Sequence, residues 1–169
     1  IEDTDQERST VDSLDEIISS LKWLGISWDE GPYFQSKRLD TYKNYAEDLL
    51  NKGLAYKCFM TNEEIQKLKE EASKENKIYQ YPKTWRNRSD HPENADFVIR
   101  FKTPESKEIK FADSLRGNIS INSSNIDDFV ILKSDGFPTY NFASAVDDAE
   151  MEITNVIRGE DHLSNTPKQ

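Results

Sequence analysis

Two segments near the start of the chain carry apolar residues at helical spacing. The first runs from Thr10 to Leu24, and the second begins at Leu39. A recurrence every three or four positions places such side chains on one face of a helix, so both patterns predict amphipathic helices that pack on a sheet. The apolar positions are Val11, Leu14, Ile17, Ile18, Leu21 and Leu24 in the first segment, and Leu39, Tyr42, Tyr45, Ala46, Leu49 and Leu50 in the second.

Residues that favour helix ends bracket both segments. Ser9 or Thr10 can cap the first helix and Ser36 the second, because a hydroxyl can accept a hydrogen bond from a free backbone N–H of the first turn. Gly25 and Gly53 follow the two patterns and predict where the helices end.

The rest of the chain has mainly strand-like patterns. Short alternating or β-branched runs predict strands at LAYKCF, DFVIRFKTP, KEIKFAD and GNISIN. A helix, TNEEIQKLKEEA, interrupts them and opens with a capping box of Thr61 and Glu64. FVILK and PTYNFA flank the turn residues Asp135 and Gly136 and predict a hairpin, and ITNVI is typical of a buried parallel strand.

Helix-rich ends around a β-rich middle indicate an α/β fold with an insertion. We expect residues 1–53 and 129–169 to belong to an outer α/β domain and residues 54–128 to form the inserted part.

The composition of the chain excludes several classes of protein. Aromatic residues make up 11% of the 169 residues, which argues for a folded chain despite a mean hydropathy of −0.84. The net charge of −10 argues against an indiscriminate nucleic-acid binder, although it leaves room for a local basic surface. A single cysteine excludes an internal disulfide framework, and no membrane span or signal peptide is recognisable, so a soluble, intracellular chain is expected. We also expect a cytoplasmic monomer.

The sequence VIRGEDH places an arginine at the end of the predicted strand ITNVI. In open α/β sheets ligands bind beyond the carboxyl ends of the strands, so the guanidinium of Arg158 would face a carboxylate or phosphate there. The alternative, at about even odds, is an ion pair with Glu160 or Asp161.

Other polar positions have a structural interpretation that is more probable than a functional one. Glu2, Asp3 and Asp5 could hold an ammonium group, a ribose or a metal, but acids before a helix more often interact with its dipole. Asp147 and Asp148 could bind magnesium, but a turn or a cap is favoured.

The cysteine, the histidines and one basic segment complete the candidates. Cys58 is expected to be a small buried residue, and His91 and His162 are too few for a metal site. The stretch IYQYPKTWRNR combines basic with aromatic residues, as an RNA-contacting surface does. The alternative is an exposed loop.

Five strings, in their order along the chain, resemble successive blocks of the catalytic region of bacterial-type glutamyl-tRNA synthetases, which are class I enzymes. The resemblance covers nearly the whole chain and is weakest from Glu70 to Pro92. The strings are IEDTDQERS, LKWLGISWDEGPYFQSKR, LLNKGLAYKCF, DDFVILKSDGFPTYNFA and VDDAEMEITNVIRGEDHLSNTPKQ.

This resemblance implies a partial Rossmann-type catalytic domain interrupted by an inserted, mixed α/β acceptor-binding domain. Residues 1–53 would be part of the Rossmann-type domain, 54–128 the insertion, and 129–169 a hairpin and the start of the returning Rossmann half. The family's HIGH-type and KMSKS-type segments and its anticodon-binding region are absent, so the chain resembles an internal fragment that is inactive alone.

The resemblance also implies roles for individual residues. Glu2, Tyr140, Ser144 and Arg158 match positions of the glutamate pocket: Glu2 near the amino group, and Arg158 at the side-chain carboxylate. Ser144 departs from the commoner residue types there. Asp161 matches a position near ATP. Asp5 and Arg8 match positions near the terminal adenosine of tRNA.

The implied reaction is the ligation of L-glutamate to tRNA(Glu), with ATP and Mg²⁺, through glutamyl-adenylate. The alternatives are a non-catalytic module that binds the tRNA acceptor stem and a truncated relative that glutamylates a modified tRNA base. Some relatives hold zinc through cysteines at the position of Cys58, two residues later and in the following loop. Here Met60 and Trp85 occupy the other places, so no zinc is expected. The resemblance fits the bacterial cytoplasm or an organelle of bacterial descent.

Overall fold

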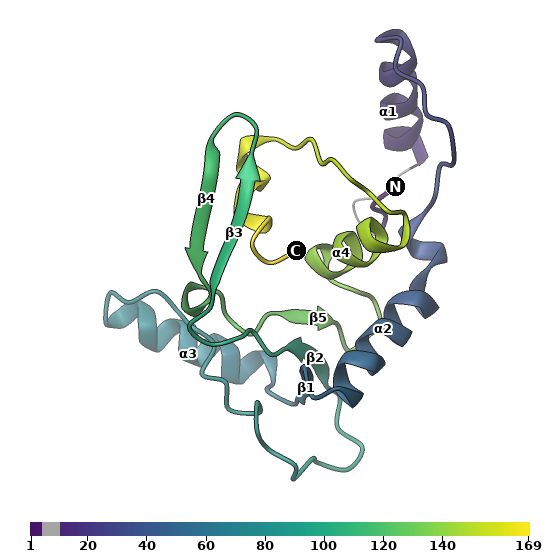
Figure 1. Cartoon of the computed structure of the whole chain (residues 1–169). Helices are drawn as coiled ribbons and strands as arrows, with labels where there is room; N and C mark the ends of the chain where they lie inside the picture. The colour runs from purple at the N-terminus through teal and green to yellow at the C-terminus, as the bar shows by residue number, and fades with distance from the viewer. Residues whose placement is uncertain (5–10) are drawn as a thin grey trace.

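The computed structural model describes residues 1–4 and 11–169, with side chains from residue 14 onward in the second range. Its helices are α1 (Val11–Trp23), α2 (Leu39–Asn51), α3 (Asn62–Lys74) and α4 (Tyr140–Glu150), and its 3-10 helices are η1 (Gln35–Lys37), η2 (Ser123–Asn125) and η3 (Glu160–Asn165). The strands are β1 (Ala55–Cys58), β2 (Val98–Phe101), β3 (Glu108–Asp113), β4 (Gly117–Asn122) and β5 (Val130–Leu132). Figure 1 shows how these elements are arranged.

A three-stranded antiparallel sheet lies at the centre of the fold, in the order β1-β2-β5. Ala55 pairs with Phe101 and Cys58 with Val98, and the pairing of β2 with β5 shifts register between Ile99 and Arg100. Because β5 belongs to this sheet, the sheet draws strands from both sides of residue 128.

Helices α2 and α4 pack with this sheet around the main core. α2 buries most of the face predicted from its sequence, except Tyr45, which is exposed. Phe142, Ala143 and Val146 come from α4. The buried members of the core are Tyr42, Ala46, Ala55, Ile99, Ile131, Phe142, Ala143 and Val146. Burying an aliphatic or aromatic side chain stabilises a fold by roughly 1.5–3 kcal/mol, so this cluster fixes α4 against α2.

The other strands form a separate hairpin, β3-β4, paired from Glu108↔Asn122 to Asp113↔Gly117. Its tip turns through Gly117 with φ +76°, a conformation that favours glycine. Helix α3 begins with the predicted capping box: Glu64 N donates to Thr61 Oγ1 at 3.2 Å, and Thr61 N donates to Glu64 Oε2 at 2.8 Å.

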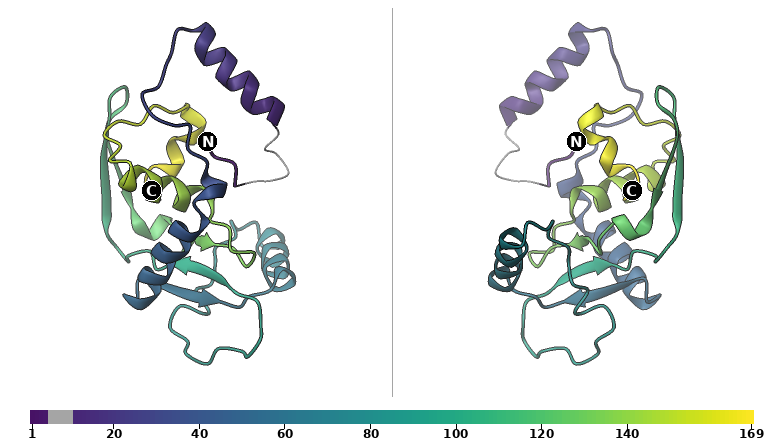
Figure 2. Two further views of the ribbon diagram at one scale, coloured as in Figure 1. Left: turned by 90° about the vertical axis from the view of Figure 1, so that its right-hand side faces the viewer. Right: turned by 90° about the vertical axis from the view of Figure 1, so that its left-hand side faces the viewer.

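Helix α1 stands away from the rest of the protein, as Figures 1 and 2 both show. Its spacing gives the predicted helix, but its apolar face is not packed on the sheet: Ile17 is 56% exposed and Trp23 is 85% exposed. The predicted caps Ser9 and Thr10 lie outside the described residues. Along the described part of the chain, no helix is both long enough and apolar enough to cross a lipid bilayer.

Three predictions about local structure are wrong. Ser36 does not cap α2, whose N-cap is Arg38; Ser36 lies in η1 and bonds to Asp3 instead. PTYNFA forms a single bridge, Leu132↔Pro138, and then the start of α4, because Phe142, Ala143 and Val146 bury a helical face. The hairpin turn itself is confirmed: Phe137 N donates to Asp135 Oδ1 at 2.9 Å.

The third error is ITNVI, which is extended but forms no strand. Val156 is 53% exposed and Ile157 fully exposed. A strand needs a partner for its backbone groups, and within residues 1–4 and 11–169 none pairs with this segment.

A buried carboxylate joins the loop after α3 to the central sheet. Asp128 is 0% exposed and accepts hydrogen bonds from Tyr56 OH at 2.9 Å and Thr103 N at 3.0 Å, and it pairs with Arg86. Burial, and then the bond to Asp128, raise the pKa of Tyr56, so this phenol keeps its proton and donates. All three groups thus bind the same carboxylate.

We expect Asp128→Ala to lower the free energy of unfolding by about 3 kcal/mol or more, because it leaves the Arg86 charge and two other donors without their acceptor. The measurement is equilibrium denaturation in urea. Asp90→Ala is the matched control, since it breaks an aspartate–arginine pair at the surface, with Arg88. Equal losses in both variants would contradict the role given to Asp128.

Candidate functional site

Helix α4 brings residues from opposite ends of the chain together. Tyr140 begins the helix, and Ser144 follows one turn later. The hydroxyl of Ser144 donates to Glu2 Oε1 at 3.0 Å, although 142 positions separate the two residues. The first residues of the chain are therefore held at the face of α4 that carries Ser144.

The N-terminal segment is also held by the residues before α2. The backbone nitrogen of Ile1 donates to the Tyr33 carbonyl at 2.7 Å, and Gln35 N donates to the Ile1 carbonyl at 3.1 Å. Asp3 accepts from the backbone N and the hydroxyl of Ser36 at 2.8 and 2.6 Å. Partial burial raises the pKa of Asp3, but the bonds from Ser36 outweigh it and hold the pKa below its usual value. Glu2 and Asp3 thus contact α4 and η1.

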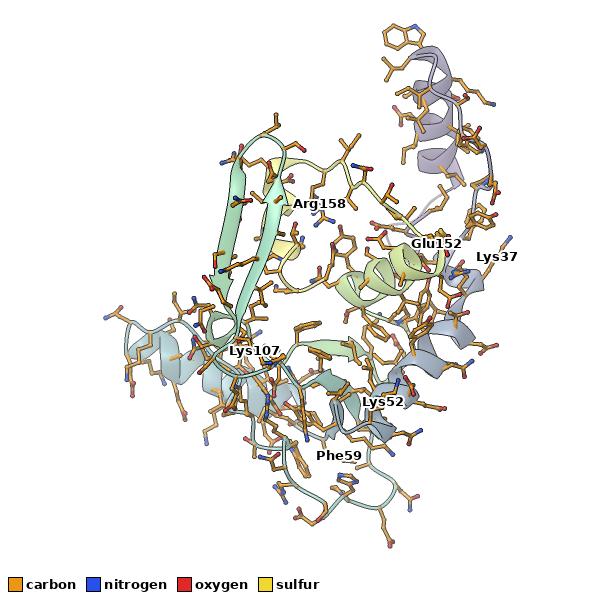
Figure 3. All side chains as sticks on the ribbon, in the orientation of Figure 1. Lys37, Lys52, Phe59, Lys107, Glu152 and Arg158 are labelled. Atoms are coloured by element: carbon orange, nitrogen blue, oxygen red, sulfur yellow. The ribbon has the colours of Figure 1, made fainter. Side chains whose placement is uncertain are left out.

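Arg158 reaches α4 from the other end of the chain. Its guanidinium donates to Thr166 Oγ1 at 3.1 Å and to Gln169 Oε1 at 2.7 Å. The amide of Gln169 in turn donates to Asn141 Oδ1, on α4, at 3.2 Å. Figure 3 shows Arg158 on the segment between α4 and η3, with its side chain inside the fold.

The alternative ion pairs of Arg158 do not form. Glu160 contacts Arg116, at the tip of the β3-β4 hairpin, and Asp161 Oδ2 lies 3.6 Å from His162 Nε2. Among the described residues, no carboxylate oxygen lies within 4.0 Å of the Arg158 guanidinium. Its direct partners are neutral groups.

A cavity of about 220 Å³ lies between the N-terminal segment, η1 and α4. Three carboxylates and one guanidinium are among its walls, which gives the cavity an acidic character that suits a cationic group. The polar lining residues are Glu2, Gln35, Arg38, Ser144, Asp147 and Asp148.

The charges around the cavity affect one another. Burial raises the pKa of Asp148, and the neighbouring Asp147 adds to this effect, while the charge of Arg158 works in the opposite direction. Arg158 itself is not among the residues that line the cavity. On the same side, the ring of Tyr140 lies 6.1 Å from that of His162.

The structure corrects the interpretation of Asp147 and Asp148. Both lie inside α4, not in a turn or a cap. Asp147 accepts hydrogen bonds from Gln35, Arg38 and Tyr42. Sequence reasoning missed these donors, although their spacing of three and four positions is a signal that they share one face.

The remaining candidates lie elsewhere. Asp161 is exposed in η3, and Asp5 and Arg8 lie outside the described residues. In the part of the chain that is described, no three His, Cys, Asp or Glu side chains gather as metal ligands would. Cys58 is buried, with its sulfur 3.2 Å from the Tyr81 hydroxyl.

The basic and aromatic segment IYQYPKTWRNR is a loop, and part of it has a structural role. Arg86 forms an ion pair with the buried Asp128. Arg88 lies over the Trp85 ring at 4.1 Å and pairs with Asp90, and Trp85 packs against Phe59.

Comparisons with known proteins identify chains that are similar to this one along its whole length. The glutamate–tRNA ligase of Hydrogenobaculum sp. (strain Y04AAS1) is 53% identical to the chain, and that of Thermodesulfovibrio yellowstonii is 50% identical. Both matches cover 100% of this chain but only 38% and 36% of the relatives' own lengths. The chain thus spans little more than a third of these relatives.

Solved structures show the same similarity. The crystal structure of a glutamate tRNA ligase from Elizabethkingia meningosepticum, in complex with its amino acid, matches 99% of this chain and 38% of that one, with a TM-score of 0.88 and 38% identity. The glutamate-tRNA synthetase of Elizabethkingia anophelis matches equally well.

The family model for the catalytic domain of class I tRNA synthetases (E and Q) matches residues 1–169. The mixed α/β fold seen here is that of the class I synthetase catalytic domain. The chain therefore belongs to the class I tRNA synthetases of the glutamate and glutamine group.

Proposed function

We propose that the protein that contains this chain ligates L-glutamate to tRNA(Glu) with ATP. The observation that carries the proposal is that both charged residues are linked to one turn of α4: Glu2 accepts from Ser144, and Arg158 donates to Gln169, which in turn donates to Asn141. The names of the similar proteins, all glutamate–tRNA ligases, support it.

The reaction has two steps. First, the α-carboxylate of glutamate attacks the α-phosphorus of ATP; an O–P bond forms and pyrophosphate leaves, giving glutamyl-adenylate. Then a hydroxyl of the terminal tRNA ribose attacks the acyl carbon, and AMP leaves as the ester forms. Mg²⁺ bound to ATP would neutralise phosphate charge, while the residues of this chain orient glutamate.

Opposite charges would grip opposite ends of the amino acid. Glu2, fixed by Ser144, would accept from the ammonium group, and the acidic cavity beside it suits a cation. Arg158 would pair with the side-chain carboxylate, and Tyr140 would line the pocket between them.

The neutral partners of Arg158 favour this assignment. A carboxylate that replaces the Gln169 amide oxygen turns a neutral acceptor into a charged one, and hydrogen bonds to charged groups are stronger, at about 1.5–3 kcal/mol. Glutamine has almost the same shape as glutamate, but its amide offers no charge to Arg158. A fixed cation therefore separates the two amino acids where shape does not.

The remaining assignments follow the resemblance. Asp161 would lie near ATP, and Asp5 and Arg8 near the terminal adenosine of tRNA. We also propose residues 1–53 and 129–169 as parts of a Rossmann-type domain and residues 54–128 as an insertion that binds the acceptor end. The separate β3-β4 hairpin within 54–128 supports such an insertion.

The first test is tRNA charging by the protein expressed from its complete reading frame. Glutamate and glutamine are supplied side by side at equal concentration, with ATP and tRNA(Glu). We expect ester formation with glutamate and a kcat/KM for glutamine lower by about 100-fold or more, because the amide offers Arg158 a neutral acceptor in place of a charged carboxylate. No transfer of glutamate to tRNA would overturn the proposed function.

Arg158→Ala should lower kcat/KM for glutamate by about 100-fold or more, because it removes the cation that faces the substrate carboxylate. Lys52→Ala is the control, since Lys52 is an exposed cation that pairs with Asp48 at the end of α2, outside the proposed insertion. Both variants should keep the wild-type circular dichroism spectrum. Near wild-type charging by Arg158→Ala would refute its role.

We further propose that the protein binds no zinc. Met60 and Trp85, at places where some relatives have cysteines, pack against the buried cluster of Tyr56, Cys58 and Tyr81. These side chains do not fit a zinc ion, because a thioether is a poor ligand and an indole is none.

Metal analysis of the purified protein should therefore find far less than one zinc ion per chain. Cys58→Ser is the matched control, and it should leave this value unchanged. A full equivalent of zinc in the wild type that disappears in Cys58→Ser would place the metal at this cluster and contradict the proposal.

A further inference from the structure

A cluster of hydrogen bonds around Asp147 joins α4 to the residues that lead into α2. Asp147 accepts from Gln35 Nε2 at 2.9 Å, from Arg38 Nε at 3.0 Å, and from Tyr42 OH at 2.9 Å to each oxygen. The Arg38 and Asp147 side chains keep only 24% and 14% of their exposure, so this ion pair is largely removed from water.

The same residues hold the N-terminal segment, so the contacts form a closed ring. Gln35 N binds the Ile1 carbonyl, and Ser36 binds Asp3, on either side of Glu2 in the sequence. Ser144, on the turn of α4 before Asp147, donates to Glu2 at 3.0 Å. Glu2 is thus fixed twice: through the backbone beside it by η1, and through its side chain by α4.

Asp147 joins the two elements that hold Glu2, because it connects α4 to η1 and α2. Its three donors lie on one face of η1 and α2, and together they fix where α4 stands against Gln35. Without the carboxylate, the Arg38 charge would remain largely buried with no anion beside it. α4 would then shift against η1, and the Ser144–Glu2 bond would lengthen.

We propose that Asp147 is a positioning residue for the amino-group end of the amino-acid pocket: through Gln35, Arg38 and Tyr42 it fixes the distance between Ser144 and Glu2. This inference rests on the proposed function, in which Glu2 accepts from the ammonium group of glutamate. It predicts an effect on glutamate binding with little effect on ATP.

The test uses steady-state charging by the full-length protein, with glutamate and ATP varied separately. Asp147→Asn should raise the KM for glutamate by about tenfold, while the KM for ATP changes by less than about twofold. Tyr42→Phe removes one donor without touching the ion pair, and it should raise the KM for glutamate by about threefold.

The chain offers a matched control in Tyr45→Phe. Tyr45 also lies on α2 and donates to a carboxylate of α4, Glu150, at 2.5 Å, but this pair is exposed and lies outside the ring. If Asp147 only joined the two helices, Tyr45→Phe and Tyr42→Phe would have the same effect. We expect a wild-type KM for glutamate in Tyr45→Phe.

A double variant tests whether Asp147 acts through Ser144. Ser144→Ala removes the bond to Glu2 directly, so adding Asp147→Asn should raise the KM for glutamate less than it does in the wild-type background. Fully additive effects would overturn the proposal. If Asp147→Asn does not fold, Tyr42→Phe alone decides, and a wild-type KM for glutamate in that variant overturns the inference.

The two proposals fail in different ways. A wild-type protein that does not charge tRNA with glutamate overturns the proposed function. A wild-type protein that charges, with Asp147 and Tyr42 variants that keep their KM for glutamate, overturns only the role of Asp147.

Discussion

A carboxylate that is withdrawn from water must be matched by donors, and this constraint organises the structure at two places. Asp128 gathers Tyr56, Arg86 and Thr103, and so joins the loop after α3 to the central sheet. Asp147 gathers Gln35, Arg38 and Tyr42, and so joins α2 to α4. Each carboxylate binds donors that lie far away in the sequence, and so it fixes how the segments that carry them are placed relative to one another. Apolar packing supplies most of the stability of the fold.

The amount that could be predicted from the sequence differs between the elements and the site. Helical spacing, glycine stops and the Thr61–Glu64 box are local signals, and they correctly gave α1, α2 and α3. PTYNFA and ITNVI were misjudged because a short apolar run fits a strand or a helix equally well, and a strand also needs a partner that the pattern does not reveal. Tyr42 shows a further limit: its position marks it as a core residue, which is correct, but the partner of its hydroxyl lies 105 positions away.

The links of Glu2 and Arg158 to α4 could not be derived from spacing either, because their hydrogen bonds join residues at no fixed separation in the sequence. Glu2 and Arg158 were identified through a resemblance, while their shared neighbourhood is a property of the folded chain. Arg38 was missed and Asp147 was interpreted as a turn or cap residue, because an ion pair between helices has no fixed separation in sequence.

In the proposed site, the surroundings of the two charged residues would suit a zwitterion. Glu2 is held by a hydroxyl, and Arg158 by a hydroxyl and an amide, so each is oriented by neutral groups of the described chain. Had Arg158 been paired with Glu160 or Asp161, a substrate carboxylate would have to displace an anion, and the gain in free energy from the new ion pair would largely cancel. Hydrogen bonds to neutral groups fix the direction of each charged side chain. They do not neutralise its charge, so the charge can still attract an ion of opposite sign. Under the proposed function, discrimination between glutamate and glutamine would follow from the one group by which the two amino acids differ.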